Sequence, residues 1–337
     1  MRVLIDHQMP FVLAHGGFQI QIEQTKEALA KIGLEVEYLR FWDSSQKADI
    51  IHVFGRCSRG YIELAQGKGI AVVMSDLLSE TGSRSPMALF AQKNIIRVAQ
   101  SVMPGRFLSR MGWDSFRMAD AVIAGTPLEA RLMVDLFGSD ESKLHVVPNG
   151  VEECFFGNGS VDGREEWLIS TVTITPRKRA VELAQAAVAG KVKVRIIGKP
   201  YSEQDPYYHQ FVKICRANPQ YVDYSGPIAD REELARAYRK ARGFVLFSIF
   251  ESLSLSAGEA AAAGCPLLLT DLPWARTTFG EHAVYCPLAA TVEEGGRILN
   301  SFSRNIATQP KPPPQLRWTE VAERLKAIYG AALTSRN

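Results

Sequence analysis

Short apolar runs alternate along the chain with longer segments in which apolar residues recur every three or four positions. Helical spacing of this kind covers Ile20 to Ile32 and Pro127 to Phe137. Buried strands that alternate with helices are typical of a doubly wound parallel sheet. The strand-like runs of the first half are Val3–Ile5, Glu35–Leu39, Ile50–Phe54, Ile70–Met74, Ala121–Ala124 and Leu144–Val147.

The same alternation restarts after a turn-rich stretch that contains Gly157, Gly159 and Gly163, which favours a linker. Helical spacing returns over Val181–Ala189 and Arg231–Ala241. The strand-like runs are now Trp167–Val172, Val192–Ile197, Val222–Tyr224, Phe244–Phe247, Pro266–Leu269 and Ala283–Tyr285.

We therefore expect an α/β protein with two Rossmann-like domains, residues 1–153 and 164–308, whose parallel sheets face a central cleft. Pro310 to Pro314 interrupts the chain before a final amphipathic helix. We expect this helix, residues 315–333, to return to the N-terminal domain.

Composition narrows the classes of function. The chain of 337 residues has a net charge of only +3 and no long basic tract, so we expect no nucleic-acid partner. Its five scattered cysteines never form a C-x-x-C pair, which argues against disulfides and zinc and favours a reducing cytoplasm. No apolar run reaches about 18 residues, and no signal peptide is recognisable, so we expect a cytoplasmic protein.

Candidate chemistry concentrates between Phe250 and Pro266. An apolar strand precedes this segment, Ser252 or Ser254 is a suitable N-cap, and an alanine-rich helix follows. The first turn of a helix has unpaired backbone N–H groups and a positive dipole end, which suit an anion.

Glu251 and Glu259 flank this helix start, eight residues apart. Two carboxylates beside a phosphate site suit a ribose on one side and a hexose on the other, because carboxylates accept hydrogen bonds from neighbouring hydroxyls. The alternative is that both side chains belong to a solvated helix face.

The segment resembles the Glu-x7-Glu motif of retaining GT-B glycosyltransferases of family 4, the glycosyl transferases group 1. Other pieces that resemble this family follow in the expected order. They are Gly16-Gly17 after the first strand, Pro148-Asn149-Gly150-Val151, Thr173 to Lys178, Ile196-Ile197-Gly198 and Tyr224-Ser225-Gly226.

The resemblance implies a retaining transfer of a sugar from a nucleotide-diphosphate-sugar, UDP-, GDP- or ADP-linked, to a hydroxyl acceptor, without a cofactor or metal. Lys178 would neutralise the diphosphate, Glu251 would contact the transferred sugar, and Glu259 would bind the ribose. Thr173 stands where the family has an arginine, and Arg177 or Arg179 would compensate. The remaining donor-site positions implied are Ser252, Leu253, Ser254, Leu255, Gly198, Pro227, Ile228, Gly16 and Gly17.

Three other readings stay open: a non-catalytic nucleotide-sugar-binding subunit, a GT-B nucleotide-sugar epimerase, and an inverting transferase. His15, beside the glycine pair, and His52, in a strand, are candidates for the acceptor side. Each is otherwise a hydrogen-bonded structural histidine.

Residues 84–118 form a basic, amphipathic region with six basic residues, one acidic residue and interleaved apolar side chains, a net charge of +5. Such a surface suits peripheral contact with an anionic membrane, on its inner face, or a lipid-diphosphate acceptor. The alternative is a helix pair packed on the sheet with its arginines in solvent.

Overall fold

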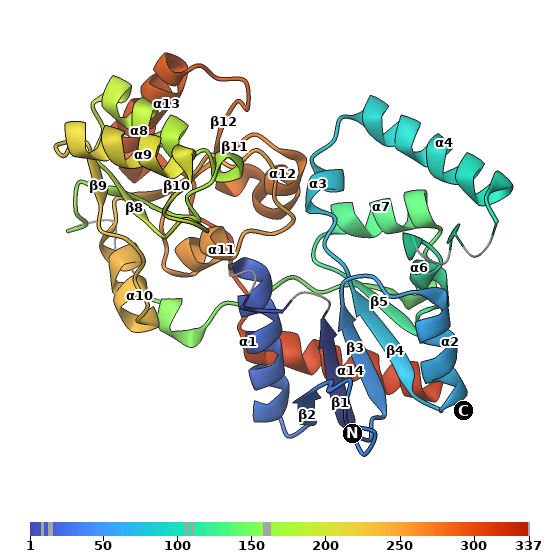
Figure 1. The fold of residues 1–337 in the computed structure, drawn as a ribbon. Coiled ribbons are helices and arrows are strands. Elements are labelled where there is room, and N and C mark those ends of the chain that lie inside the picture. The colour runs from blue at the N-terminus through green and yellow to red at the C-terminus, as the bar shows by residue number, and fades with distance from the viewer. Residues whose placement is uncertain (8–9, 13–15, 105–106, 109–110, 158–162, 336–337) are drawn as a thin grey trace. The chain divides into compact units, whose positions relative to one another are not determined.

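The computed structural model describes residues 1–7, 10–12, 16–104, 107–108, 111–157 and 163–335. The chain forms two compact units, and Figure 1 shows the strands and helices of each. Unit 1 comprises Met1–Gly150 and Trp318–Asn337, and unit 2 comprises Val151–Arg317.

Unit 1 contains a parallel sheet with the strand order β2-β1-β3-β4-β5-β6 among its described residues. Val3 of β1 pairs with Val36 on one side and Ile50 on the other, so the chain extends the sheet in both directions from β1. The interior strands β3, β4 and β5 are buried along their whole length, because helices cover both faces. The strands are β1 (Arg2–His7), β2 (Glu35–Tyr38), β3 (Ile50–Phe54), β4 (Ala71–Ser75), β5 (Ala121–Ala124) and β6 (Leu144–Val146).

Helices α2 and α7 pack on one face of this sheet, and α1 and α14 pack together on the other. Local sequence signals set the helix ends: Ser85 and Thr126 cap α4 and α7 ahead of a proline, and Gly138 ends α7 in the left-handed region. The helices are α1 (Gly17–Lys31), α2 (Arg59–Gly67), α3 (Ser79–Gly82), α4 (Pro86–Val102), α6 (Ser115–Met118), α7 (Pro127–Phe137), η1 (Glu141–Lys143) and α14 (Trp318–Thr334).

Unit 2 repeats the design with the strand order β12-β11-β10-β7-β8-β9. Leu168 of β7 pairs with Val194 on one side and Gly243 on the other. As with β1 in unit 1, later strands therefore lie on both sides of the first strand, β7. The strands are β7 (Leu168–Thr171), β8 (Val194–Ile197), β9 (Val222–Tyr224), β10 (Gly243–Leu246), β11 (Leu267–Thr270) and β12 (Val284–Cys286).

The helices of unit 2 include one unusually close pair. A Cβ on Gly190 of α8 would lie 2.3 Å from the carbonyl oxygen of Gly296 in α13, so only glycine permits this approach. Thr291 and Glu294 form a capping box that starts α13. The helices are η2 (Glu153–Phe155), η3 (Pro176–Lys178), α8 (Ala180–Gly190), α9 (Pro206–Ala217), α10 (Arg231–Lys240), α11 (Leu255–Ala262), α12 (Pro273–Phe279), η4 (Gly280–His282), α13 (Val292–Arg304) and η5 (Ile306–Thr308).

The predicted doubly wound architecture is confirmed, and each predicted strand is present to within two residues at its ends. The boundary between the units lies earlier than the predicted linker. Val151 already belongs to unit 2, where its N–H donates to the Leu316 carbonyl at 2.8 Å and Phe155 is fully buried. None of the described helices is long and apolar enough to cross a membrane.

His52 is a buried, hydrogen-bonded histidine, which favours the structural alternative given for it from the sequence. The ring is only 1% exposed, with Nδ1 2.7 Å from Tyr329 Oη of α14 and Nε2 2.7 Å from Ser75 Oγ of β4. It also stacks on Phe54. His52 therefore joins α14 to the sheet as a buried neutral group, and burial lowers its pKa to about 3.

This pKa makes the stability of the protein sensitive to acid. As the pH falls below about 6.5, His52 becomes protonated in the unfolded chain. In the folded chain it stays neutral until about pH 3. At about pH 5 this linkage removes about 2 kcal/mol of stability relative to neutral pH. We expect His52→Gln to lose less stability over that interval than the wild type, as measured by urea unfolding. Because the other titrating groups are the same in both proteins, the difference in the loss of stability reports on His52. An equal loss of stability in both proteins would contradict a buried, neutral His52.

Candidate functional site

The strand order of unit 2 reverses between β7 and β10, which are neighbours in the sheet. The loops that follow these two strands leave the carboxyl edge of the sheet in different directions, and α/β proteins usually bind ligands in the crevice between such loops. A backbone hydrogen bond of 2.9 Å from Ile249 N–H to the Arg177 carbonyl ties the two loops together. The topology alone therefore selects residues 172–179 and 247–254 as the candidate site.

Three charged side chains meet at this point. The Lys178 ammonium donates to Glu251 Oε1, and Arg177 Nη1 lies 3.2 Å from Glu251 Oε2. Arg177 also donates to the Phe250 carbonyl at 3.2 Å and stacks over the Phe250 ring. The site therefore unites the predicted catalytic pair Lys178 and Glu251 with Arg177, one of the two arginines expected to compensate for Thr173.

Burial and charge act in opposite directions on this cluster. Burial raises the pKa of Glu251, but the Lys178 and Arg177 cations outweigh it and hold that pKa below its usual range. Burial lowers the pKa of Lys178, with Glu251 opposing the shift. Because two cations share one carboxylate, the cluster keeps a net positive charge, which favours an anionic ligand.

The N-terminus of α11 begins directly after the cluster. Ser254 is the N-cap, and its Oγ accepts a hydrogen bond from Ala257 N–H at 3.3 Å. The predicted N-cap was Ser252 or Ser254, and the structure selects the second. Ser252, Leu253 and Leu255 complete the turn between β10 and the helix, so the backbone N–H groups of the first turn lie in the same loop as Glu251.

Glu259 lies one turn into α11 and does not belong to a solvated face, since it is 5% exposed. Its Oε1 accepts from Arg231 Nη2 of α10, and its Oε2 accepts from Tyr238 Oη at 3.3 Å. Arg231 also contacts Glu152 Oε1 at 2.6 Å. Burial raises the pKa of Glu259, and Arg231 acts against that shift.

The other predicted donor positions of unit 2 follow three neighbouring strands at the same sheet edge. Thr173 follows β7, Gly198 follows β8, and Pro227 and Ile228 follow β9. Gly198 has a φ of 147°, and a Cβ there would lie 1.8 Å from the Val172 carbonyl oxygen. Only glycine therefore lets the loops after β7 and β8 come this close.

Of the predicted positions beside the first strand of unit 1, the structure describes Gly16 and Gly17. Gly16 caps α1 with a φ of 138°, and Gly17 is the first residue of that helix, at the carboxyl edge of its own sheet. His15 lies outside the described residues. The predicted approach of Gly16 and Gly17 to the donor site stays a prediction.

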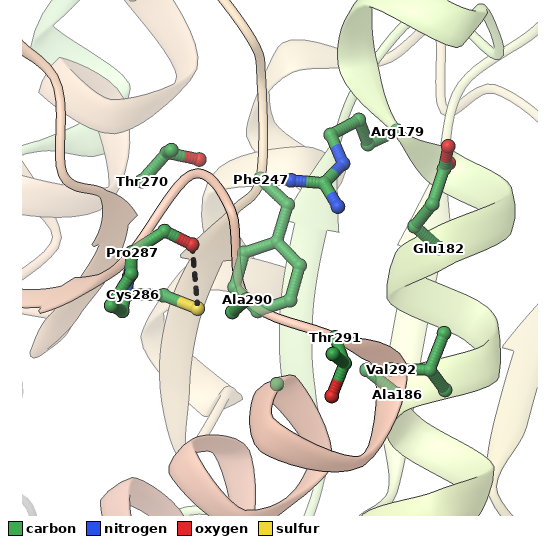
Figure 2. A pocket seen from close by; sticks show the side chains of 11 residues that line it. Arg179, Glu182, Ala186, Phe247, Thr270, Cys286, Pro287, Ala290, Thr291 and Val292 are labelled. Atoms are coloured by element: carbon green, nitrogen blue, oxygen red, sulfur yellow. Dashed lines mark hydrogen bonds between the residues drawn. The ribbon is translucent and has the colours of Figure 1, made fainter.

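A small pocket borders the loops after β7 and β10 at the carboxyl edge of unit 2, where Arg179 and Phe247 line it together with residues of β11, β12 and the start of α13 (Figure 2). Its volume of about 20 Å³ suits roughly one water molecule. Arg179 reaches over it and donates to the Leu288 carbonyl at 2.9 Å, and Glu182 accepts from Tyr207 Oη at 2.8 Å. We assign the candidate site to the Lys178–Glu251 loops, because the charged cluster and the start of α11 meet there.

Across the described ranges, no three His, Cys, Asp or Glu side chains gather in a way that could hold a metal ion. The expectation of a metal-independent site therefore stays a prediction. All five cysteines are free thiols.

Sequence reasoning missed Arg231, Tyr238 and Glu152, which surround Glu259. One signal was available, because Arg231 is the first residue of a helix, where a cation opposes the helix dipole. Such a position indicates that a specific anion partner compensates.

The two-sheet architecture and the site at the strand-order reversal define the fold as GT-B. Among solved structures, the glycosyltransferase AviGT4, involved in avilamycin A biosynthesis, matches with a TM-score of 0.61 and 17% identity, covering 99% of this chain and 98% of that one. Anabaena Alr3699/HepE in complex with UDP matches with a TM-score of 0.65 and 15% identity, covering 100% and 97%. At these identities the likeness establishes the fold alone.

Sequence comparison narrows the family for unit 2. Residues 174–297 match the family described as glycosyl transferases group 1, which confirms the resemblance seen in the Glu-x7-Glu segment. D-inositol 3-phosphate glycosyltransferase of Kineococcus radiotolerans is 27% identical over 47% of this chain and 41% of its own length. Mannosylfructose-phosphate synthase of Agrobacterium fabrum is 23% identical over 63% and 53%. The chain thus spans about half the length of the curated relatives it matches.

Proposed function

We propose that this protein is a retaining glycosyltransferase that moves a sugar from a nucleotide-diphosphate-sugar to a hydroxyl acceptor. The observation that carries the proposal is the net-positive cluster of Lys178, Arg177 and Glu251 beside the start of α11, at the strand-order reversal of unit 2. The match of residues 174–297 to group 1 glycosyltransferases supports it.

The cluster suggests how the chemistry proceeds. A donor diphosphate competes with Glu251 for Lys178 and Arg177, which frees the carboxylate to accept hydrogen bonds from the sugar. As the bond from the anomeric carbon to the diphosphate breaks, the two cations and the first N–H groups of α11 stabilise the leaving oxygen. The acceptor oxygen bonds to the anomeric carbon on the same face, and its proton passes to the departing diphosphate.

The nucleoside half of the donor would lie along the neighbouring loops. Glu259 would accept the ribose hydroxyls, and Pro227 and Ile228 would contact the base after the glycine-dependent turn at Gly198. Anabaena Alr3699/HepE has been solved with UDP and with UDP-glucose, which supports a uracil nucleotide as the first to test, followed by GDP and ADP.

Thr173 keeps a second candidate function open. The family's arginine is missing there, and Arg179, one of the two predicted substitutes, donates to the Leu288 carbonyl instead of joining the cluster. Diphosphate binding would then depend on Arg177 and Lys178, and a protein that binds nucleotide-sugars without turnover is the alternative.

We also propose that unit 1 docks on an anionic lipid bilayer through α4. Within this helix only Ile96 is buried, and large apolar side chains face solvent instead. An exposed apolar surface of this kind on one helix is uncommon in proteins that bind nothing there. Met87 is 84% exposed, Phe90 69%, Ile95 66%, Val98 59% and Val102 72%.

The charge of the chain segment that contains α4 argues for an anionic bilayer as the occupant. From Thr81 to Trp113 the chain has five basic residues and no acidic residue. Two of these basic residues form ion pairs with acidic residues outside that stretch: Arg84 with Glu80, and Lys93 with Asp135. Arg97 lies exposed on α4. Apolar side chains that enter the bilayer boundary, with cations beside them near anionic headgroups, describe an interfacial helix.

The donor proposal predicts selective stabilisation by one nucleoside diphosphate. At a concentration of about a hundred times its Kd, such a ligand adds about 2.7 kcal/mol of stability, which a thermal-shift screen of UDP, GDP and ADP detects. Incubation of the matching sugar donor with a hydroxyl acceptor should give a product with the donor's anomeric configuration by NMR. Binding without product would favour the non-catalytic candidate, and no shift with any nucleotide would overturn the donor site.

Replacing Lys178 with methionine keeps the stem of the side chain and removes its charge. We expect turnover to fall roughly 10²–10³-fold, because one donor to the leaving oxygen is lost. Single-turnover kinetics with saturating donor measure this loss separately from binding. Lys193→Met is the matched control, since Lys193 is an exposed lysine of the same unit paired with Glu166. Equal rates for the two variants would move the diphosphate contact away from Lys178.

The membrane proposal predicts that the protein sediments with vesicles that contain anionic lipid and not with purely zwitterionic ones. The double variant Phe90→Ser, Val98→Ser should bind roughly tenfold more weakly or worse, because two large apolar side chains no longer enter the bilayer. Leu64→Ser, at a 71% exposed position of α2, is the control and should bind normally. Unchanged binding of the double variant, or self-association through this helix in analytical ultracentrifugation, would overturn the proposal.

A further inference from the structure

We infer that Arg231 is a positioning residue that holds Glu259 ready to accept the two hydroxyls of a nucleotide ribose. The inference rests on the proposed function, in which Glu259 meets the ribose. It concerns the groups that keep this buried side chain in place and ionised.

Arg231 lies at a helix start and contacts two carboxylates and an aromatic ring. It is the first residue of α10, where the positive end of the helix dipole repels a cation. The guanidinium lies 4.7 Å from the centre of the Phe155 ring, and Phe155 is fully buried. Two carboxylates compensate: Glu152 accepts from Arg231 Nε at 2.8 Å, and Glu259 accepts from its Nη2. An arginine fork can serve both at once because its donors point in fixed directions.

The hydrogen bonds around Glu259 leave it with spare capacity. An ionised carboxylate offers about four lone-pair sites. Arg231 uses a site on Oε1, and Tyr238 uses a site on Oε2. One site on each oxygen therefore stays available for a ligand, which matches two neighbouring hydroxyl donors. A protonated Glu259 would lose one of these acceptors.

Arg231 is the group that most favours the ionised form of Glu259. Burial raises the pKa of Glu259, Glu152 raises it further, and Arg231 lowers it, while the buried Tyr238 donates a hydrogen bond that also lowers it. With the cation removed, burial and Glu152 act against Tyr238 alone, so the pKa of Glu259 rises and the carboxyl holds its proton to higher pH. Ribose recognition should then become dependent on pH.

The experiment measures the affinity of the full-length protein for UDP, GDP and ADP, and for the 2′-deoxy form of whichever binds, by titration calorimetry from about pH 5.5 to about pH 8.5. The variants are Arg231→Gln, Arg231→Lys and the control Arg236→Gln, an exposed arginine of the same helix. Circular dichroism reports folding. Should Arg231→Gln fail to fold, Arg231→Lys carries the test, because it keeps the charge and loses the fork.

We expect the wild type and Arg236→Gln to prefer the ribonucleotide. Arg231→Gln should bind it at least about tenfold more weakly at the acidic end, where it should no longer distinguish it from the deoxynucleotide, and both the affinity and the discrimination should recover as the pH rises. Arg231→Lys should lose affinity at every pH without gaining pH dependence. An equal, pH-independent loss for both nucleotides in Arg231→Gln, or wild-type discrimination in Arg231→Lys, would overturn the role of Arg231 and leave nucleotide binding standing. No nucleotide binding by the wild type would instead overturn the proposed function.

Discussion

A carboxylate buried in a protein remains ionised only where cations or hydrogen bonds replace the water it has lost, and unit 2 has two buried glutamates with cation partners, eight residues apart. Glu251 relies on Lys178 and Arg177, and Glu259 relies on Arg231. Removing one partner from a buried ion pair typically costs about 3–5 kcal/mol, so each cation fixes the geometry of the loop that contains it. The need to keep each glutamate beside its cation therefore constrains the loops after β7 and β10 and the start of α10.

The two glutamates differ in what a ligand would do to them. Glu251 shares two cations, so an entering dianion takes part of their charge and leaves the carboxylate free to turn to a new donor. Glu259 shares one cation with Glu152, so an anion there meets net negative charge, whereas neutral hydroxyl donors do not. Electrostatics alone thus separates a phosphate end of the site from a hydroxyl end.

The sequence predicted the parts of the fold that depend on neighbours along the chain. Buried parallel strands such as Ile50–Phe54 are continuous apolar runs, and caps such as Thr126 before Pro127 are local signals. The partners of the two glutamates were harder to find, because Arg231 and Lys178 lie 28 and 73 residues away from them in sequence. The sequence left two roles open for His52 for the same reason, since its hydrogen-bond partner Tyr329 is 277 residues distant.

Unit 1 contains a buried glutamate whose hydrogen bonds come from the backbone. Glu129 is 2% exposed and accepts from the backbone N–H groups of Leu78 and Gly125 at 2.8 and 3.1 Å. Burial dominates there and raises its pKa to about 7, so this carboxyl is partly protonated at neutral pH. Two backbone donors do not offset burial as the paired cations at Glu251 do. Both Glu251 and Glu129 are buried and hydrogen-bonded, but only Glu251 contacts cations. That contact therefore distinguishes Glu251, which we expect to exchange partners with a diphosphate, from Glu129, which stabilises the fold.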